Sequence, residues 1–303
     1  MVALAFFSLM YCVLSSLALL AWRGMRLVRR KPFSGSANFL FGLRLFPFAT
    51  SVGVACLLTF PSFWLLERSS PDEDTGTFVL ALCSLVMLGA GIFRVLRAQA
   101  RTRRAVNLWL SRPKRSDGNA GTPATRAASG VPPLILVGVR RPKVLISETA
   151  VALLSKDELQ VAVRHELGHM RSWDNLKKVL LNSTPFPGMS GLETAWQEAA
   201  ELAADDAAIA NRQEALDLAA ALIKLSRSFQ EQAAPALATG LFSGASSISA
   251  RVEHLLEWRM PGGRFPRTWP GILLVVLTPI VGVASNYDAA LVFTHRLTEL
   301  LVP

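Results

Sequence analysis

The chain has 303 residues, of which 51% are hydrophobic, and this size accommodates one folded domain together with several membrane-spanning helices. The net charge of +10 would suit a protein that binds nucleic acid, but residues 131–258 carry 12 Lys and Arg against 15 Asp and Glu. The excess of basic charge lies beside apolar runs. We therefore predict a membrane protein that contacts lipids and makes no direct contact with nucleic acid.

The first three apolar runs lie at 2–22, 45–66 and 78–93, and a fourth follows much later at 269–284. The first run has the length of a bilayer span, and no charge precedes residue 23, which favours a retained helix over a signal peptide. The second run contains Pro47 and Pro61, which membrane helices tolerate. The pattern predicts four transmembrane helices.

Basic residues flank these runs on one side only. Residues 23–44 carry six basic residues and no acidic one, residues 67–74 are mainly acidic, and residues 94–115 carry eight basic residues and no acidic one. The positive-inside rule then predicts an N-terminus outside a bacterial-type inner membrane, with residues 94–268 in the cytosol. The basic charge of 94–110 also predicts attraction to anionic lipid headgroups.

The composition divides the chain into five segments. Residues 1–110 are expected to contain three transmembrane helices and a basic stalk. Residues 111–130 are rich in small polar residues, which predicts a flexible linker. A catalytic domain follows over 131–260, the fourth transmembrane helix over 268–286 and a short extracytoplasmic tail over 287–303. The domain opens with two short apolar strands around a turn at 133–147. The edge of the strand at 143–147 is expected to bind an extended substrate.

A metal-binding motif lies inside this domain. Ser155 and Glu158 form a capping-box pattern, so a helix is predicted from about residue 156 to 172. On it, His165 and His169 are four residues apart and present both imidazoles to one point, a spacing that suits Zn²⁺. Glu166 lies about 100° round the helix from His165, close enough to meet a metal-bound water without being a ligand.

A third ligand is expected from a later helix. Residues 196–207 are rich in Ala and have high helix propensity, and they place Glu201 and Asp205 at positions i and i+4. Glu198 on the same stretch is the competing candidate. The order His-Glu-x-x-His and then Glu-x-x-x-Asp resembles the gluzincin metallopeptidases. That resemblance implies Glu201 as the third Zn²⁺ ligand and Asp205 as the carboxylate that orients a zinc histidine.

The resemblance extends over residues 131–258, which also contain Asp174 just after the first helix and a later segment with Arg251 and His254. This order is similar to the BlaR/MecR family of membrane-embedded zinc metallopeptidases. It implies a mainly α membrane protein with four transmembrane helices. A cytosolic α+β gluzincin-like zinc metallopeptidase domain would be inserted between helices 3 and 4, with Asp174 anchoring the end of the zinc helix.

The same resemblance implies a substrate class. BlaR/MecR receptors cleave a DNA-binding repressor, so a protein substrate of that kind is expected here. Those receptors carry a large penicillin-binding sensor after the fourth span, whereas about seventeen residues follow it in this sequence. Direct sensing of β-lactams is therefore not expected, and the sequence does not indicate an activating signal or an oligomeric state.

The chemistry follows from the motif. Bound Zn²⁺ lowers the pKa of its water, Glu166 acts as general base, and the oxyanion needs a second stabiliser besides the metal. Arg251 and His254 are the two candidates for that stabiliser. For Arg251 the alternative is an ion pair with an acidic neighbour, and for His254 the alternative is an ordinary surface histidine.

Two other functions compete with this interpretation. The first is a processing or quality-control protease of the HtpX or CAAX-endopeptidase type, which shares much of the motif order. The second is a non-catalytic membrane scaffold that keeps the fold. The scaffold hypothesis predicts that a ligand or the base is missing, yet His165, Glu166, His169 and Glu201 are all present.

Overall fold

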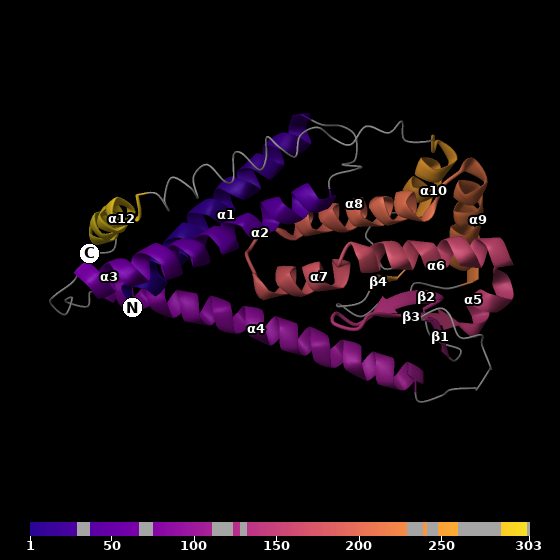
Figure 1. Cartoon of the computed structure of the whole chain (residues 1–303), viewed down its shortest axis with the longest axis horizontal. Coiled ribbons are helices and arrows are strands. Elements are labelled where there is room, and N and C mark those ends of the chain that lie inside the picture. Colours follow the sequence, from indigo (N-terminus) through magenta and orange to yellow (C-terminus); the bar gives the residue numbers. More distant parts are fainter. Residues whose placement is uncertain are drawn as a thin grey trace. The chain divides into compact units, whose positions relative to one another are not determined.

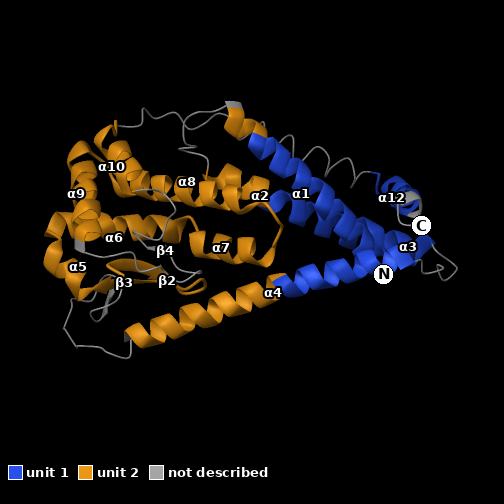
Figure 2. Ribbon diagram, turned by 180° about the vertical axis from the view of Figure 1, so that it is seen from behind, with its two compact units in different colours: residues 1–23, 45–90, 261–303 blue, residues 24–44, 91–260 orange. Residues whose placement is uncertain are grey.

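The structure is a computed structural model, and it describes residues 1–28, 37–66, 75–110, 124–127, 132–228, 239–240, 248–259 and 286–301. Most of these residues are helical (Figure 1). They form two compact units, which Figure 2 shows in different colours. Unit 1 comprises residues 1–23, 45–90 and 261–303, and unit 2 comprises residues 24–44 and 91–260.

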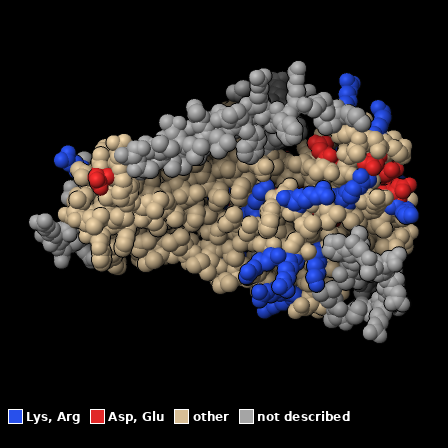
Figure 3. All heavy atoms as spheres, viewed as in Figure 1, with Lys and Arg blue, Asp and Glu red and all other residues tan. Residues whose placement is uncertain are grey.

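Three of the described helical segments are long and apolar enough to cross a membrane, and they coincide with the first three predicted apolar runs. They are α1 (Val2–Val28), the continuous run of α2 (Ala37–Val54), η1 (Ala55–Thr59) and α3 (Phe60–Leu66), and the first part of α4 (Thr75–Leu110). Large apolar side chains on them are exposed, including Leu57 and Trp64. Figure 3 shows a broad area of one face without charged side chains. The fourth predicted span, 269–284, lies outside the described residues.

Unit 1 contains a π-helical turn, η1, directly before Pro61. Proline has no N–H to donate to the carbonyl four residues earlier, which is that of Leu57. The Tyr287 hydroxyl donates a hydrogen bond to this carbonyl at 2.7 Å. Tyr287 begins α12 (Tyr287–Leu301), and the ring of His295 on the same helix lies 4.8 Å from the ring of Phe63. The predicted tail is therefore a helix that packs on η1 and α3.

Unit 2 contains a four-stranded sheet with the order β1-β3-β2-β4. Its strands are β1 (Ala124–Ala127), β2 (Leu134–Val137), β3 (Lys143–Ser147) and β4 (Thr239–Gly240). The predicted pair of strands is confirmed, with β2 antiparallel to β3. Its turn needs Gly138, whose φ is 96° and where a Cβ would lie 2.9 Å from the Arg141 carbonyl oxygen.

Strand β3 was expected to offer a free edge to substrate, and this expectation is wrong. The strand pairs with β2 on one side and with β1, in parallel, on the other. Strand β1 lies within 111–130, the segment expected to be a flexible linker. The other residues of that segment are outside the described part of the chain.

Both faces of β2 are covered, because its alternate side chains enter two different cores. Leu134 and Leu136 join the main core, which is built with the helices α5 (Glu148–Leu153), α6 (Lys156–Arg171), α8 (Ser190–Ala208), α9 (Arg212–Ser228) and α10 (Ile248–Leu256). Ile135 and Val137 face the other way and contact Val106 and Trp109 of α4. The third apolar helix thus continues as the predicted stalk and covers the sheet.

A second side of the stalk is basic. Arg94, Arg97, Arg101 and Arg104 are all exposed and recur at helical spacing, while Thr102 is buried. Figure 3 shows basic side chains gathered in groups on the displayed face. The stalk is therefore amphipathic, with one side packed in the domain core and another side densely charged.

The helix predicted from about residue 156 to 172 is confirmed as α6, with both hydrogen bonds of the capping box present between Ser155 and Glu158. Lys224 of α9 binds the same Glu158 carboxylate at 2.7 Å. Helix α6 ends at Arg171, and Trp173, with a left-handed φ of 57°, separates it from α7 (Asp174–Ser183). Asp174 is thus the first residue of a second helix.

Gly91 of α4 provides a test of the packing of unit 2. A Cβ at Gly91 would lie 2.1 Å from the carbonyl oxygen of Ser183 at the end of α7. Gly91→Ala should therefore lower the free energy of unfolding by about 1–3 kcal/mol through overpacking. Gly89→Ala is the matched control, because nothing lies within 4 Å of a Cβ there. Thermal unfolding of both variants in detergent checks this, and equal midpoints would contradict the close approach.

Candidate metal centre

Helices α6 and α8 approach each other closely where both carry small residues. A Cβ at Gly168 of α6 would lie 3.4 Å from the Cα of Ala204 on α8. His165 and His169 lie on either side of Gly168 in the sequence, and Glu201 and Asp205 lie on either side of Ala204. The two motifs predicted from spacing therefore meet at the point of closest approach.

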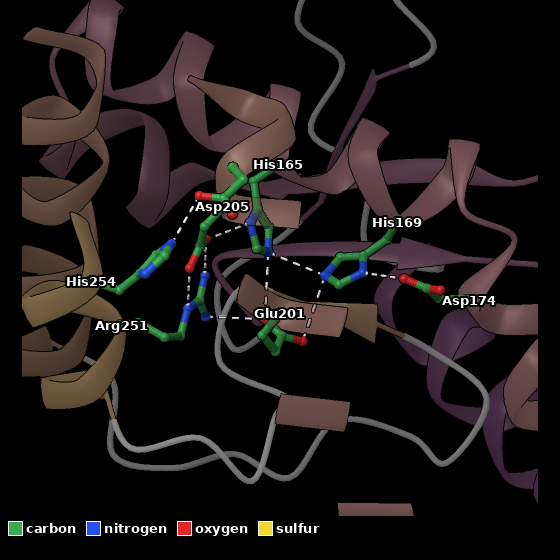
Figure 4. A network of polar contacts seen from close by, with 8 residues as sticks. His165, His169, Asp174, Glu201, Asp205, Arg251 and His254 are labelled. Carbon is green, nitrogen blue, oxygen red and sulfur yellow. Dashed lines mark hydrogen bonds and ion pairs between the residues drawn. The ribbon is translucent and has the colours of Figure 1, made fainter. Parts of the chain in front are cut away.

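Three buried side chains converge at this point (Figure 4). The Nε2 atoms of His165 and His169 are 3.2 Å apart, and each lies 3.5 Å from an oxygen of the Glu201 carboxylate. One ligand atom from each residue lies within 4.8 Å of the others. Among the described residues, this group consists of His165, His169 and Glu201, and Glu198, the competing candidate, does not belong to it. The group could hold a metal ion.

Each imidazole is held from behind by a carboxylate. His165 Nδ1 lies 2.8 Å from Asp205, and His169 Nδ1 lies 2.7 Å from Asp174. If both Nδ1 atoms donate to these carboxylates, the two neutral rings present lone pairs on Nε2 to each other. Two lone pairs at 3.2 Å repel unless a proton or a metal ion lies between them. A cation at this position satisfies both rings, so the donor set fits a metal.

The buried charges of the site also favour a bound cation. Four carboxylates are buried here, those of Asp174, Glu201, Asp205 and Glu166. Burial alone would lower the pKa of His169, but the negative charge of Glu201 and the hydrogen bond that the ring donates to Asp174 raise it to about 10. Burial would likewise raise the pKa of Glu201, and its cationic neighbours hold it well below its ordinary value. The site thus favours positive charge, which protonated histidines supply when no metal does.

Glu166 is the buried carboxylate that differs from the other three. Neither of its oxygens has a hydrogen-bond partner among the described residues, and none of the side chain is exposed. Burial raises the pKa of Glu166 above its ordinary value. A buried carboxylate without partners is costly to keep, and such groups are retained where they bind something or move a proton.

Arg251 and His254 come from α10 and lie in different surroundings. The guanidinium of Arg251 is buried, donates to Asp205 at 2.8 Å through Nε and lies 3.1 Å from Glu201. The ion-pair alternative is therefore present in the structure. His254 Nε2 lies 2.8 Å from Asp206, in a pair that is partly exposed. The predicted oxyanion role of these two residues stays a prediction.

Sequence reasoning missed two cations of α7. Lys178 interacts electrostatically with Glu201, Asp174 and Glu166, while its burial lowers its pKa. Lys177 lies 3.4 Å from Asp174. Their proximity follows from the separate helix that starts at Asp174, because on that helix residues three and four positions later share its face. The positive φ of Trp173, which creates the new helix, has no signature in the sequence.

Residues 77–255 match the model of the BlaR1 peptidase M56 family, and this range is more than half of the chain. The chain belongs to this family. The matched range includes every residue of the centre described above, from His165 on α6 to Arg251 on α10. M56 membership makes the chain a peptidase of a metallopeptidase family, and with its three apolar helices it is a membrane protein. No curated protein matches the chain.

The assignment of Glu201 as the third ligand can be tested by substitution. Glu201→Ala should lower the zinc content of the purified protein strongly, because it removes a carboxylate that lies 3.5 Å from each Nε2 atom. Glu198→Ala on the same helix should keep its metal. Elemental analysis of both variants after dialysis decides this. Loss of zinc in Glu198→Ala but not in Glu201→Ala would refute the assignment.

Proposed function

We propose that this M56 peptidase is a membrane-bound, zinc-dependent metalloendopeptidase that cleaves a protein substrate on the cytosolic side of the membrane. The observation that carries the proposal is the convergence of His165, His169 and Glu201 beside Glu166, a buried carboxylate without a hydrogen-bond partner among the described residues. Ligands without a base would suit a structural metal site. The combination suits hydrolysis.

A zinc ion held by His165, His169 and Glu201 would supply Lewis acidity and lower the pKa of a water molecule. Glu166 is placed to take a proton from that water as its oxygen adds to the carbonyl carbon of the scissile peptide bond. The proton then passes from Glu166 to the departing nitrogen, the C–N bond breaks, and the products are a carboxylate and an amine.

Arg251 supports this chemistry through its contacts with Asp205 and Glu201. By holding both carboxylates it fixes the orientation of a ligand and of the group behind His165. His254 pairs with Asp206, which is not part of the metal-ligand group. Arg251 contacts a residue of the metal-ligand group, but its ion pairs with Asp205 and Glu201 are the alternative expected for it, so the oxyanion role of Arg251 and His254 stays a prediction.

The proposal includes the membrane topology and the substrate class. The basic segments at 23–44 and 94–115 support a cytosolic peptidase domain, an N-terminus outside and a fourth span at 269–284. A domain in the cytosol would meet cytosolic proteins, among them a DNA-binding repressor, which is the substrate that the BlaR/MecR resemblance implies. N-terminal proteomics of cells with wild-type and Glu166→Gln protein would identify the cleaved proteins. Unfolded membrane proteins among them would favour quality control.

The role of Glu166 as the base can be tested independently of metal binding. Glu166→Gln should retain zinc, because Glu166 is not a ligand, and should lose peptidase activity by about 10²–10⁴-fold. The measurement compares metal content and cleavage of a protein substrate in the same preparation. Activity within a few-fold of the wild type would contradict the assigned mechanism.

The topology can be tested by thiol labelling. In a background with Cys12, Cys56 and Cys83 replaced by Ala, a cysteine at Gly121 should resist a membrane-impermeant maleimide in intact cells. A cysteine at Thr75 should react, because the acidic turn before it is predicted to lie outside. Both should react after the membrane is opened. The opposite pattern would place the peptidase domain outside.

A further inference from the structure

The first two turns of α2 carry three residues spaced three apart, and each of them contacts the helices that frame the metal centre. They are Asn38, Phe41 and Arg44, all within unit 2. Residues three apart lie on one face of a helix. This stretch was expected only to be part of a basic loop before a span, with no role at the metal site.

A chain of polar contacts runs from this face to a metal ligand. The Asn38 side-chain oxygen accepts a hydrogen bond from Lys177 Nζ at 2.8 Å, and the same Nζ lies 3.4 Å from Asp174 Oδ1. The other oxygen, Asp174 Oδ2, lies 2.7 Å from His169 Nδ1. The Asp174 carboxylate is thus shared between a lysine on one side and a ligand histidine on the other.

The position of Lys177 is set by α2. Besides the bond to Asn38, its Nζ lies 5.6 Å from the centre of the Phe41 ring, a distance at which a cation is attracted to the ring face. Only 14% of the Lys177 side chain is exposed. A lysine has many rotamers, and these two contacts select the one that reaches Asp174.

Arg44 makes a second connection, to the helix that carries Glu201. Its buried guanidinium lies 2.9 Å from Glu193 in the first turn of α8 and donates to the carbonyl and the hydroxyl of Thr184, which ends α7. The Phe41 ring also lies 6.3 Å from that of Trp196 on α8. Burying an arginine costs desolvation free energy, which is offset only where the guanidinium is fully paired. The same face of α2 thus fixes the end of α7 and the start of α8.

We propose that the first two turns of α2 position the metal centre, and that Lys177 is the positioning residue that passes their placement to Asp174 and His169. The inference rests on the proposed function, because it concerns the same metal site. A carboxylate behind a ligand histidine fixes the ring and increases its basicity. Lys177 neutralises that buried carboxylate and holds one of its oxygens, which leaves the other aimed at His169.

The experiment uses the full chain in detergent, with Co²⁺ as a spectroscopic probe and Zn²⁺ affinity from competition with a chromophoric chelator. Loss of a carboxylate behind a ligand typically costs about 10–100-fold in metal affinity, and Lys177 acts one contact further out, so Lys177→Met should cost about 3–10-fold. Its Co²⁺ absorption bands should also shift, because the orientation of His169 changes. Lys177→Arg, which keeps the cation and its donors, should restore most of both.

Asn38→Leu tests whether α2 acts through Lys177. Alone it should weaken Zn²⁺ binding by a smaller factor than Lys177→Met, and combined with Lys177→Met it should cause no further loss. Lys224→Met is the matched control, because Lys224 forms an ion pair with Glu158 that stabilises α6 without contact with the metal ligands. It should lower thermal stability and leave the Co²⁺ bands in place.

The outcomes separate the inference from the function beneath it. Wild-type affinity and unchanged Co²⁺ bands in Lys177→Met would overturn the inference while leaving the metal site intact. An equal loss of affinity in Lys224→Met would overturn it too, since the effect would then be one of overall stability. A wild-type protein that binds neither Co²⁺ nor Zn²⁺ would overturn the proposed function, and the inference with it.

Discussion

Buried carboxylates are the constraint that organises unit 2. Asp174, Glu201 and Asp205 are at most 3% exposed, and an ionised carboxylate out of water is stable only where cations or N–H groups face it. Their partners come from different helices, with His165 and His169 on α6, Lys177 on α7 and Arg251 on α10. These three helices and α8, which carries Glu201 and Asp205, must therefore all be in place before all three carboxylates are satisfied. Four helices are fixed relative to one another by electrostatics as well as by packing.

The parts of the site that sequence could predict are those that depend on neighbours along the chain. The capping box of α6, the facing pair His165 and His169 and the pair Glu201 and Asp205 all follow from helical periodicity. The contacts of Lys177 with Asn38 and of Arg44 with Glu193 join residues 139 and 149 positions apart, and no local pattern marks them. The order of the strands is equally non-local, which is why β3 was wrongly expected at an edge.

The second apolar helix shows where hydropathy alone misleads. The predicted span began at residue 45, because Arg44 interrupts the apolar run, whereas the helix begins at Ala37. Glu193 and Thr184 satisfy the guanidinium, so the charge does not require the helix to end. A charge inside a long apolar helix is often taken as a boundary. Here it is an attachment point for another part of the same unit.

Helix α4 carries a constraint on length that its composition does not reveal. Gly91 must face Ser183 while Val106 and Trp109 face the sheet, and the buried Ala98 and Thr102 share that side by spacing. One inserted residue would rotate everything after it by about 100° and advance it by about 1.5 Å. The two docking points could not then be met together. A seven-residue insertion would nearly preserve the angular phase, with a rotation error of about 20°, but it would advance the second docking point by about 10 Å. The spacing between Gly91 and Trp109 is therefore fixed in length as well as in angle.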